Sequence, residues 1–235
     1  MDMNTARIKE ILNAGSGPVR PGPPHPAFPT SEWREIRVDI DPCNAPDLVC
    51  SFSNMREVVA DGRCDALWSS HSVEHLSDHE VLPTFKEFKR VLRDDGFAVV
   101  TCPNMTLIAK ALIEEDIESV AYVSPAGPIR LLDIIYGHAR SIEAGKGFMA
   151  HRTGFTAERL GRVASAAGFS EARVLEGDAF DLWAVLFMPG ADRSEIRRQV
   201  SGTNISALVG GGDAASEKSE DMKAPRPKRI RVLRH

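Results

Sequence analysis

The chain has 235 residues and a mass of 25.7 kDa, which is enough for one α/β domain with a full hydrophobic core. Hydrophobic residues make up 43% of it, charged residues 26%, and the net charge of −4 disfavours a general nucleic-acid binder. The longest apolar run, residues 182–188, is too short to span a membrane, and we expect neither a membrane partner nor a secretory signal. Four scattered cysteines without a CxxC pair indicate reduced thiols, so we expect a cytoplasmic protein.

The predicted elements alternate between strands and helices, which is typical of a parallel sheet with helices on its faces. Short apolar runs predict strands at residues 8–14, 36–40, 48–52, 65–70 and 97–102. Prolines at positions 18, 21, 23, 24, 26 and 29 exclude a regular helix between the first two strands, because proline removes a backbone donor and restricts its predecessor. A capped amphipathic helix is expected from Ser77 through about Leu92, where Asp94-Asp95-Gly96 would end it.

In the second half of the chain, the sequence predicts an insert, a final α/β segment and a tail. Residues 105–152 are expected to form an insert after the fifth strand, with helices at 105–116 and 129–136. A helix capped by Thr156 and ended by Gly168, then strands at 173–175 and 182–188, would complete a domain over residues 1–190.

Residues 200–235 are polar and charged, so we expect a flexible C-terminal tail. Its last part, from Lys223 onward, is basic and holds no acidic residue. A solvated tail is the simpler interpretation. Contact with an anionic partner, such as RNA or an acidic protein, is the alternative, and it is the only route by which we expect nucleic acid to bind.

The residues Gly15-Ser16-Gly17 follow the first predicted strand, at the edge where open α/β sheets bind ligands. Glycine has no Cβ, so backbone N–H groups can approach a ligand closely there. The second strand ends near Asp39, 22 residues after Gly17, where a carboxylate can accept hydrogen bonds from ribose hydroxyls. The dinucleotide motif needs a third glycine at the start of a helix, but Arg20 stands there after Pro18, which disfavours a nicotinamide enzyme.

Four blocks follow one another along the chain: LNAGSGP, REIRVDIDP, DALWSSHSVEHL and EFKRVLRDDGFAVVTCPN. In this order the chain resembles class I S-adenosylmethionine-dependent methyltransferases over about residues 8–104, and HRTGFT…AAGF…DLWAVLF is similar to them more loosely. The resemblance implies a doubly wound, mostly parallel, seven-stranded Rossmann-like sheet with a final antiparallel pair of strands. It also implies S-adenosyl-L-methionine as the cofactor and an oxygen or nitrogen nucleophile as the methyl acceptor.

The resemblance also implies which residues bind the cofactor. They are Ala14, Gly15, Ser16, Gly17, Asp39, Ile40, Ser51, Phe52 and Ser70. Asp39 would hold the ribose hydroxyls, Ile40 would pack beside the adenine, and Ser70 would lie with His71 near the methyl group. Ser51 is a departure, because the family often has an acidic residue there; the proline-rich stretch in place of the first helix is another.

Three histidines are candidate general bases, since imidazole titrates near neutral pH: His71, His138 and His151. Ordinary polar packing is the alternative for each of them. The letters HSVEH, from His71 on, also match the H-x-x-E-H pattern of a zinc-protease class. A zinc site needs a third protein ligand and a long helix around the motif, so we expect no metal and a structural role for Glu74 and His75.

The sequence thus predicts a methyltransferase acting on a small polar acceptor that the sequence does not identify. The alternative is a cofactor-binding or regulatory module of the same fold without catalysis, whose basic tail contacts a partner. The serine at position 51 and the missing first helix leave this alternative open. Cofactor binding without turnover would distinguish the module from the enzyme.

Overall fold

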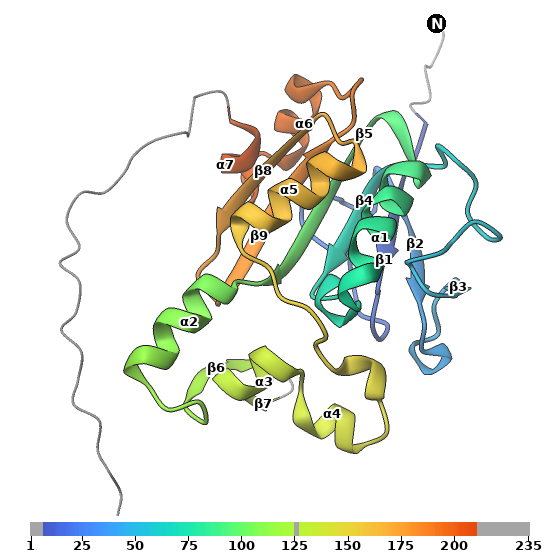
Figure 1. The fold of residues 1–235 in the computed structure, drawn as a ribbon. Helices are drawn as coiled ribbons and strands as arrows, with labels where there is room; N and C mark the ends of the chain where they lie inside the picture. Colours follow the sequence, from blue (N-terminus) through green and yellow to red (C-terminus); the bar gives the residue numbers. More distant parts are fainter. Residues whose placement is uncertain (1–6, 125–126, 211–235) are drawn as a thin grey trace, which may run out of the picture.

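A seven-stranded sheet of order β3-β2-β1-β4-β5-β9-β8 forms the centre of the structure (Figure 1). The computed structural model describes residues 7–124 and 127–210. The parallel strands are β1 (Lys9–Ala14), β2 (Trp33–Asp39), β3 (Leu48–Val49), β4 (Cys64–Ser70) and β5 (Leu92–Pro103). β9 (Asp181–Phe187) runs antiparallel to β5, and β8 (Glu171–Glu176) runs antiparallel to β9. The expected Rossmann-like sheet with a final antiparallel pair is confirmed.

One face of the sheet is covered by two amphipathic helices. Successive strand residues point to opposite faces, so Leu12 and Leu67 lie on this side, where they share a core with the helices. α1 (Asp78–Val91) and α5 (Ala157–Ala167) supply the covering side chains, and Figure 1 shows them over the same face. The predicted ends of α5 are confirmed, because Thr156 caps its start and Gly168 ends it in a left-handed conformation.

The predicted start of α1 is confirmed, but the sequence that was expected to end it lies in a strand. Ser77 and Glu80 form a capping box at the first turn. The helix ends at Val91, and Leu92 already begins β5, so residues 94–96 belong to that strand. The turn-like letters DDG are accommodated because the start of β5 is shifted in register against β4.

The opposite face is covered partly by the proline-rich segment, residues 18–30, which has no helix, as expected. The Phe28 ring is buried and stacks on Phe97, with ring centroids 6.0 Å apart. The His25 imidazole stacks on Trp68 at 5.1 Å. Aromatic side chains of an irregular segment therefore bury the sheet where proline excludes a helix.

The remainder of this face is covered by chain that was expected to be tail. α6 (Arg193–Val200) packs on it, and α7 (Ser206–Val209) follows with two buried residues, while Ile205 is fully buried in the same core. The expected start of the tail at residue 200 is therefore wrong for residues 201–210, because Ile205, Leu208 and Val209 are buried against the sheet. The basic cluster of the tail lies in residues 211–235, outside the described residues. No helix in the described part of the chain is long and apolar enough to cross a membrane.

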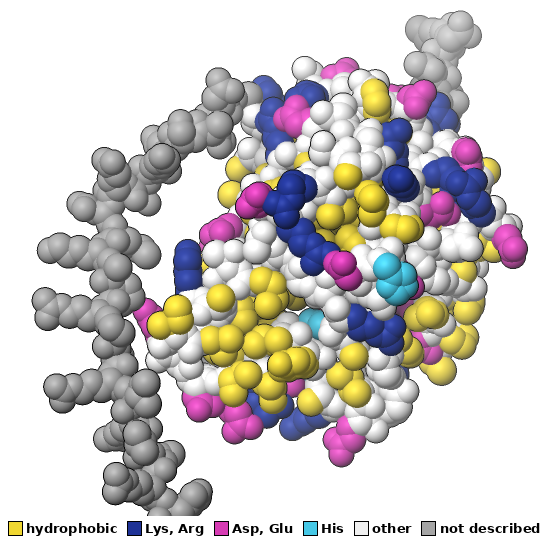
Figure 2. Space-filling view, viewed as in Figure 1, with side chains coloured by type: hydrophobic (Ala, Val, Ile, Leu, Met, Phe, Trp, Pro, Cys, Tyr) yellow, Lys and Arg dark blue, Asp and Glu magenta, His cyan; other side chains and the backbone are white. Residues whose placement is uncertain are grey.

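The insert leaves the sheet at Asn104 and returns to it at Phe155, and these two residues form a parallel bridge. Its elements are α2 (Met105–Glu114), β6 (Val120–Ser124), β7 (Gly127–Arg130), α3 (Leu131–Tyr136), α4 (Ala139–Glu143) and a 3-10 turn, η3 (Gly147–Met149). A small core around Ile108 and Leu131 holds them together. Hydrophobic side chains are also exposed over α2 and β6 (Figure 2). The insert thus has its own core and stands against the carboxyl edge of the sheet (Figure 1).

We expect Phe28→Ala to lower the free energy of unfolding by about 3–5 kcal/mol, because it empties a buried aromatic site. Val19→Ala is the matched control, since Val19 lies in the same segment but is 68% exposed, and it should change stability by less than about 0.5 kcal/mol. Urea denaturation of both variants measures the difference. Equal stabilities would mean that the proline-rich segment does not cover the sheet in solution.

Candidate cofactor and acceptor site

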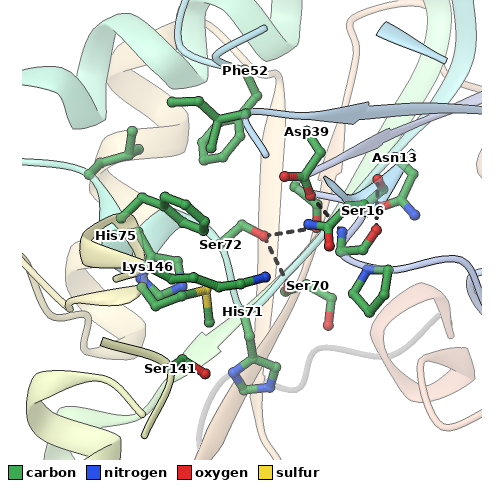
Figure 3. A pocket seen from close by; sticks show the side chains of 18 of the residues that line it. Asn13, Ser16, Asp39, Phe52, Ser70, His71, Ser72, His75, Ser141 and Lys146 are labelled. Atoms are coloured by element: carbon green, nitrogen blue, oxygen red, sulfur yellow. Dashed lines mark hydrogen bonds between the residues drawn. The ribbon is translucent and has the colours of Figure 1, made fainter. Parts of the chain in front are cut away.

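A cavity of about 910 Å³ lies at the carboxyl ends of β1, β2 and β4, with the insert as its opposite wall. The sheet side contributes Gly15, Ser16, Gly17, Asp39, Ile40, Ser51, Phe52, Ser70 and His71. The insert side contributes Ile129, His138, Ser141, Lys146, Phe148 and Met149. Figure 3 shows Asp39 and Ser16 on one side of the space, with His75 and Lys146 facing them. Apart from Ala14 and His151, every expected site residue lines this cavity.

The loop after β1 is fastened to β2 through its backbone donors. The N–H groups of Gly15 and Ser16 donate to the Val38 carbonyl at 2.9 and 3.0 Å. The N–H of Gly17 donates to the Asp39 carboxylate at 2.7 Å. All three donors are therefore occupied within the protein, which corrects the expectation that they face a ligand.

Glycine is needed at position 15 for a different reason. Gly15 has a φ of +77°, and a Cβ added to it would overlap the Ser72 side chain in the loop after β4. Both the backbone conformation and this close approach exclude a larger residue. Ala14, which was expected to contact the cofactor, is fully buried beneath the loop and does not line the cavity.

Asp39 combines burial with unused acceptor capacity. Its Oδ2 accepts from Gly17 and its Oδ1 accepts from the Asp41 N–H at 2.8 Å. Each carboxylate oxygen has two acceptor positions, so Asp39 can still accept from ribose hydroxyls. The Ile40 side chain lines the cavity although it is 52% exposed, and Phe52 adds a second apolar surface. A carboxylate beside an apolar wall fits the ribose and adenine of S-adenosylmethionine.

Two serines add polar groups to the same wall. The Ser51 and Ser53 hydroxyls lie 2.8 Å apart, so Ser51 presents a neutral group where an acidic residue is common in the family. The Ser70 hydroxyl lies 3.0 Å from that of Thr101, at the ends of β4 and β5. Both hydroxyls can donate and accept, so neither adds charge to the cavity.

His71 follows β4 and pairs with a buried carboxylate. Its φ of +48° is uncommon for a residue with a side chain, and such strain is concentrated at functional sites. The His71 Nδ1 lies 3.6 Å from the Glu74 Oε1. Burial lowers the pKa of His71, but the nearby Glu74 carboxylate outweighs it, so the pKa lies above its ordinary value. Burial likewise raises the pKa of Glu74, yet its histidine neighbours hold that pKa below the usual range.

The other two candidate histidines occupy different environments. His138 lines the cavity, and its Nδ1 lies 2.8 Å from the Ser141 hydroxyl. His151 is not among the described residues that line the cavity; its Nδ1 lies 2.8 Å from the Ile134 carbonyl. Burial lowers the pKa of His151. The structure therefore places His71 and His138 at the cavity and His151 behind its wall.

Sequence reasoning missed Lys146, which joins the insert to the end of β2. Its ammonium group lies 2.9 Å from the Asp41 carboxylate, and the two residues are 105 positions apart. This pair raises the pKa of Lys146 and lowers that of Asp41. No local pattern predicts the contact, because only the folding of the insert over the sheet creates it.

The family model described as "Methyltransferase domain" matches residues 36–100. A comparison with curated proteins gave no match. The fold is similar to that of 1,6-didemethyltoxoflavin-N1-methyltransferase from Burkholderia thailandensis, crystallised with 1,6-didemethyltoxoflavin and S-adenosylhomocysteine. The identity is 17% over 79% of this chain and 72% of that chain, with a TM-score of 0.46.

Two other similar structures are SAM-dependent methyltransferases. The one from Aquifex aeolicus is 11% identical over 77% of this chain and 82% of that chain, with a TM-score of 0.46. The one from Archaeoglobus fulgidus is 12% identical over 76% of this chain and 86% of that chain, with a TM-score of 0.48. At these values the similarities assign neither a substrate nor a residue role.

The matched residues 36–100 run from β2 into β5, and they include Asp39 and the loop after β4. The strand order is that of the class I fold, and the cavity side chains fit the ribose and adenine of the cofactor. The family match over residues 36–100 and the strand order of the sheet together make the chain similar to class I S-adenosylmethionine-dependent methyltransferases.

Proposed function

We propose that this enzyme methylates an oxygen or nitrogen atom of a small polar molecule. The observation that supports the proposal is a shared cavity, whose sheet side suits the cofactor and whose insert side presents polar groups. In the reaction, a lone pair of the acceptor forms a bond to the methyl carbon while the sulfur–methyl bond breaks. The sulfonium becomes the neutral thioether of S-adenosylhomocysteine, and the acceptor loses a proton.

Each part of the cofactor has a proposed position. Asp39 accepts hydrogen bonds from the ribose, and Ile40 and Phe52 flank the adenine. The loop of residues 15–17 borders the amino-acid end, and Ser70 lies beside the methyl group. In this arrangement the acceptor approaches from the insert, since that is the wall opposite the loop.

The proposed acceptor is small because the cavity is bounded on both sides. A volume of about 910 Å³ lies near the upper end of the roughly 300–1,000 Å³ typical of small-molecule sites. The cofactor fills part of it, and the ion pair of Lys146 with Asp41 ties the insert to β2. His138 and Ser141 then supply the polar contacts that orient the acceptor.

We propose His138 as the general base of the reaction. When its Nδ1 donates to the Ser141 hydroxyl, its Nε2 carries a lone pair that can take the acceptor proton. His71 is already engaged by Glu74, and we assign it to the wall near the methyl group. His151 lies behind the wall and is too enclosed to reach an acceptor.

The first experiment is calorimetric titration of the purified full chain with S-adenosylmethionine and S-adenosylhomocysteine, with NAD as a control. We expect micromolar binding of the first two alone. A screen of small alcohols, phenols and amines for uptake of a labelled methyl group then seeks the acceptor. A folded protein that binds the cofactor yet methylates nothing in broad screens would favour the non-catalytic module.

We expect Asp39→Asn to weaken S-adenosylhomocysteine binding by about 1.5–3 kcal/mol, or roughly 10- to 150-fold, because charge-assisted hydrogen bonds to the ribose are lost. Asp47→Asn is the matched control: the Asp47 carboxylate also accepts a backbone N–H of β2, from Arg37, but it lies outside the cavity. Calorimetry on both variants measures the effect. Unchanged affinity in Asp39→Asn would remove the ribose assignment.

We expect His138→Gln to lower kcat by about 10²- to 10⁴-fold with the acceptor found in the screen, because proton removal is lost. Affinity for S-adenosylhomocysteine should stay the same, since His138 stands on the acceptor side. His79→Gln, an exposed histidine of α1, serves as the control with unchanged kcat. Full turnover in His138→Gln would show that the acceptor needs no base at this position.

A further inference from the structure

Glu74 has one carboxylate oxygen without a partner, although its side chain is only 2% exposed. The other oxygen, Oε1, lies 3.6 Å from the His71 Nδ1 and 4.0 Å from the His151 Nε2. Within the described residues no group donates a hydrogen bond to Oε2. A buried carboxylate oxygen without a donor is costly, so each such atom in a native structure needs an explanation.

Two imidazoles beside Glu74 are oriented in a particular way. The His75 and His151 rings lie 4.9 Å apart at an angle of 63°. The His151 Nδ1 lies 2.8 Å from the Ile134 carbonyl, and the His75 Nδ1 lies 3.3 Å from the Ala150 carbonyl. A carbonyl can only accept, so each Nδ1 carries a proton, and in the neutral ring the Nε2 keeps its lone pair. Histidines that bind metals are held in this way, with one ring nitrogen donating to a backbone carbonyl.

The three side chains are brought together by the backbone. The Glu74 carbonyl accepts the N–H groups of Arg152 and Thr153, at 2.9 and 3.2 Å, directly after His151. The His151 N–H in turn donates to the Tyr136 carbonyl at the end of α3. One ligand atom each from Glu74, His75 and His151 lies within 4.8 Å of the others. Backbone hydrogen bonds therefore bring Glu74, His75 and His151 together.

We propose that Glu74, His75 and His151 bind one divalent transition-metal ion. Two imidazoles and a carboxylate form the ligand set of known zinc sites and of non-haem iron sites, and imidazole disfavours magnesium and calcium. The ion would supply the missing partner of the Glu74 Oε2. The set differs from the H-x-x-E-H pattern, because His71 is not part of it and His151 comes from the far end of the insert.

The place of the ion gives it a role in the reaction, a step that depends on the proposed function. His75 lines the cavity, so the ion would lie in the wall where the acceptor enters. Three protein ligands leave a coordination position open. A hydroxyl bound there is oriented and loses its proton more readily, which favours an acceptor with an oxygen nucleophile and a neighbouring polar group.

The test uses the full chain, freed of metal by a chelator and titrated with Zn²⁺ alone by calorimetry. We expect one ion per chain, and a loss of affinity of more than about 100-fold in His151→Gln and in Glu74→Gln. Even outer partners of metal ligands are worth about 10–100-fold, so loss of a ligand should exceed this. His138→Gln is the matched control, because it removes another cavity histidine but no ligand. The absorption spectrum with Co²⁺ gives an independent readout of nitrogen and oxygen coordination.

Every variant is also titrated with S-adenosylhomocysteine to show that it is folded. If Glu74→Gln does not fold, His75→Gln and His151→Gln carry the test. Wild-type protein that binds S-adenosylhomocysteine but no stoichiometric metal would overturn the metal site and leave the proposed function standing. Equal metal affinity in His151→Gln would also overturn it, because the ion would then lie elsewhere. Metal binding without cofactor binding would contradict the proposed function alone.

Discussion

The cavity depends on the fastening of the insert to the sheet at both of its ends. Asn104 and Phe155 form a bridge where the insert departs and returns, and the Glu74 carbonyl accepts the N–H groups of the residues just before that return. Because both ends are held at one sheet edge, the intervening chain has to fold back over that edge. Without these contacts, Asp39 and its neighbours would lie in an open groove, and water would compete for every polar contact made there.

The same contacts concentrate charge at the floor of the cavity. They place a buried carboxylate, Glu74, against three imidazoles, those of His71, His75 and His151. A buried negative charge is tolerated only beside a positive one or a set of donors. The Glu74 Oε2 has no donor within the described residues, and the proposed cation would supply its partner. The cation would thus connect the packing of the insert to the chemistry of the site.

The cofactor half of the site shows how the chain manages without a first helix. In many nucleotide sites the start of a helix faces the ligand with free N–H groups. Here the proline-rich segment excludes that helix, and the loop N–H groups are bound to β2. In the proposed arrangement the cofactor is therefore bound by the Asp39 carboxylate and by the apolar side chains of Ile40 and Phe52. The sheet face that the helix would have covered is buried by Phe28, His25 and the helices after β9.

The positions of most strands, the cap of α1, the missing first helix, and Asp39 with the glycine loop follow from local patterns, whereas the sheet architecture and the other cofactor residues were implied by the resemblance. Apolar alternation, capping residues, prolines and glycines determine the backbone conformation of neighbouring residues. Their effects can therefore be predicted from the sequence. Asp39 and the loop of residues 15–17 were found in this way.

The insert side of the cavity could be found only from the tertiary structure. The contact of Lys146 with Asp41, the enclosure of His151 and its approach to Glu74 join segments that no local pattern connects. The packing of α7 was missed for a related reason, because a short apolar run is stable only against a surface that the rest of the chain provides. Sequence by itself therefore determined most strands and the glycine loop with Asp39, since these depend on short-range propensities. The grouping of Glu74, His75 and His151 depends on where a long insert returns, and only the folded chain settles that.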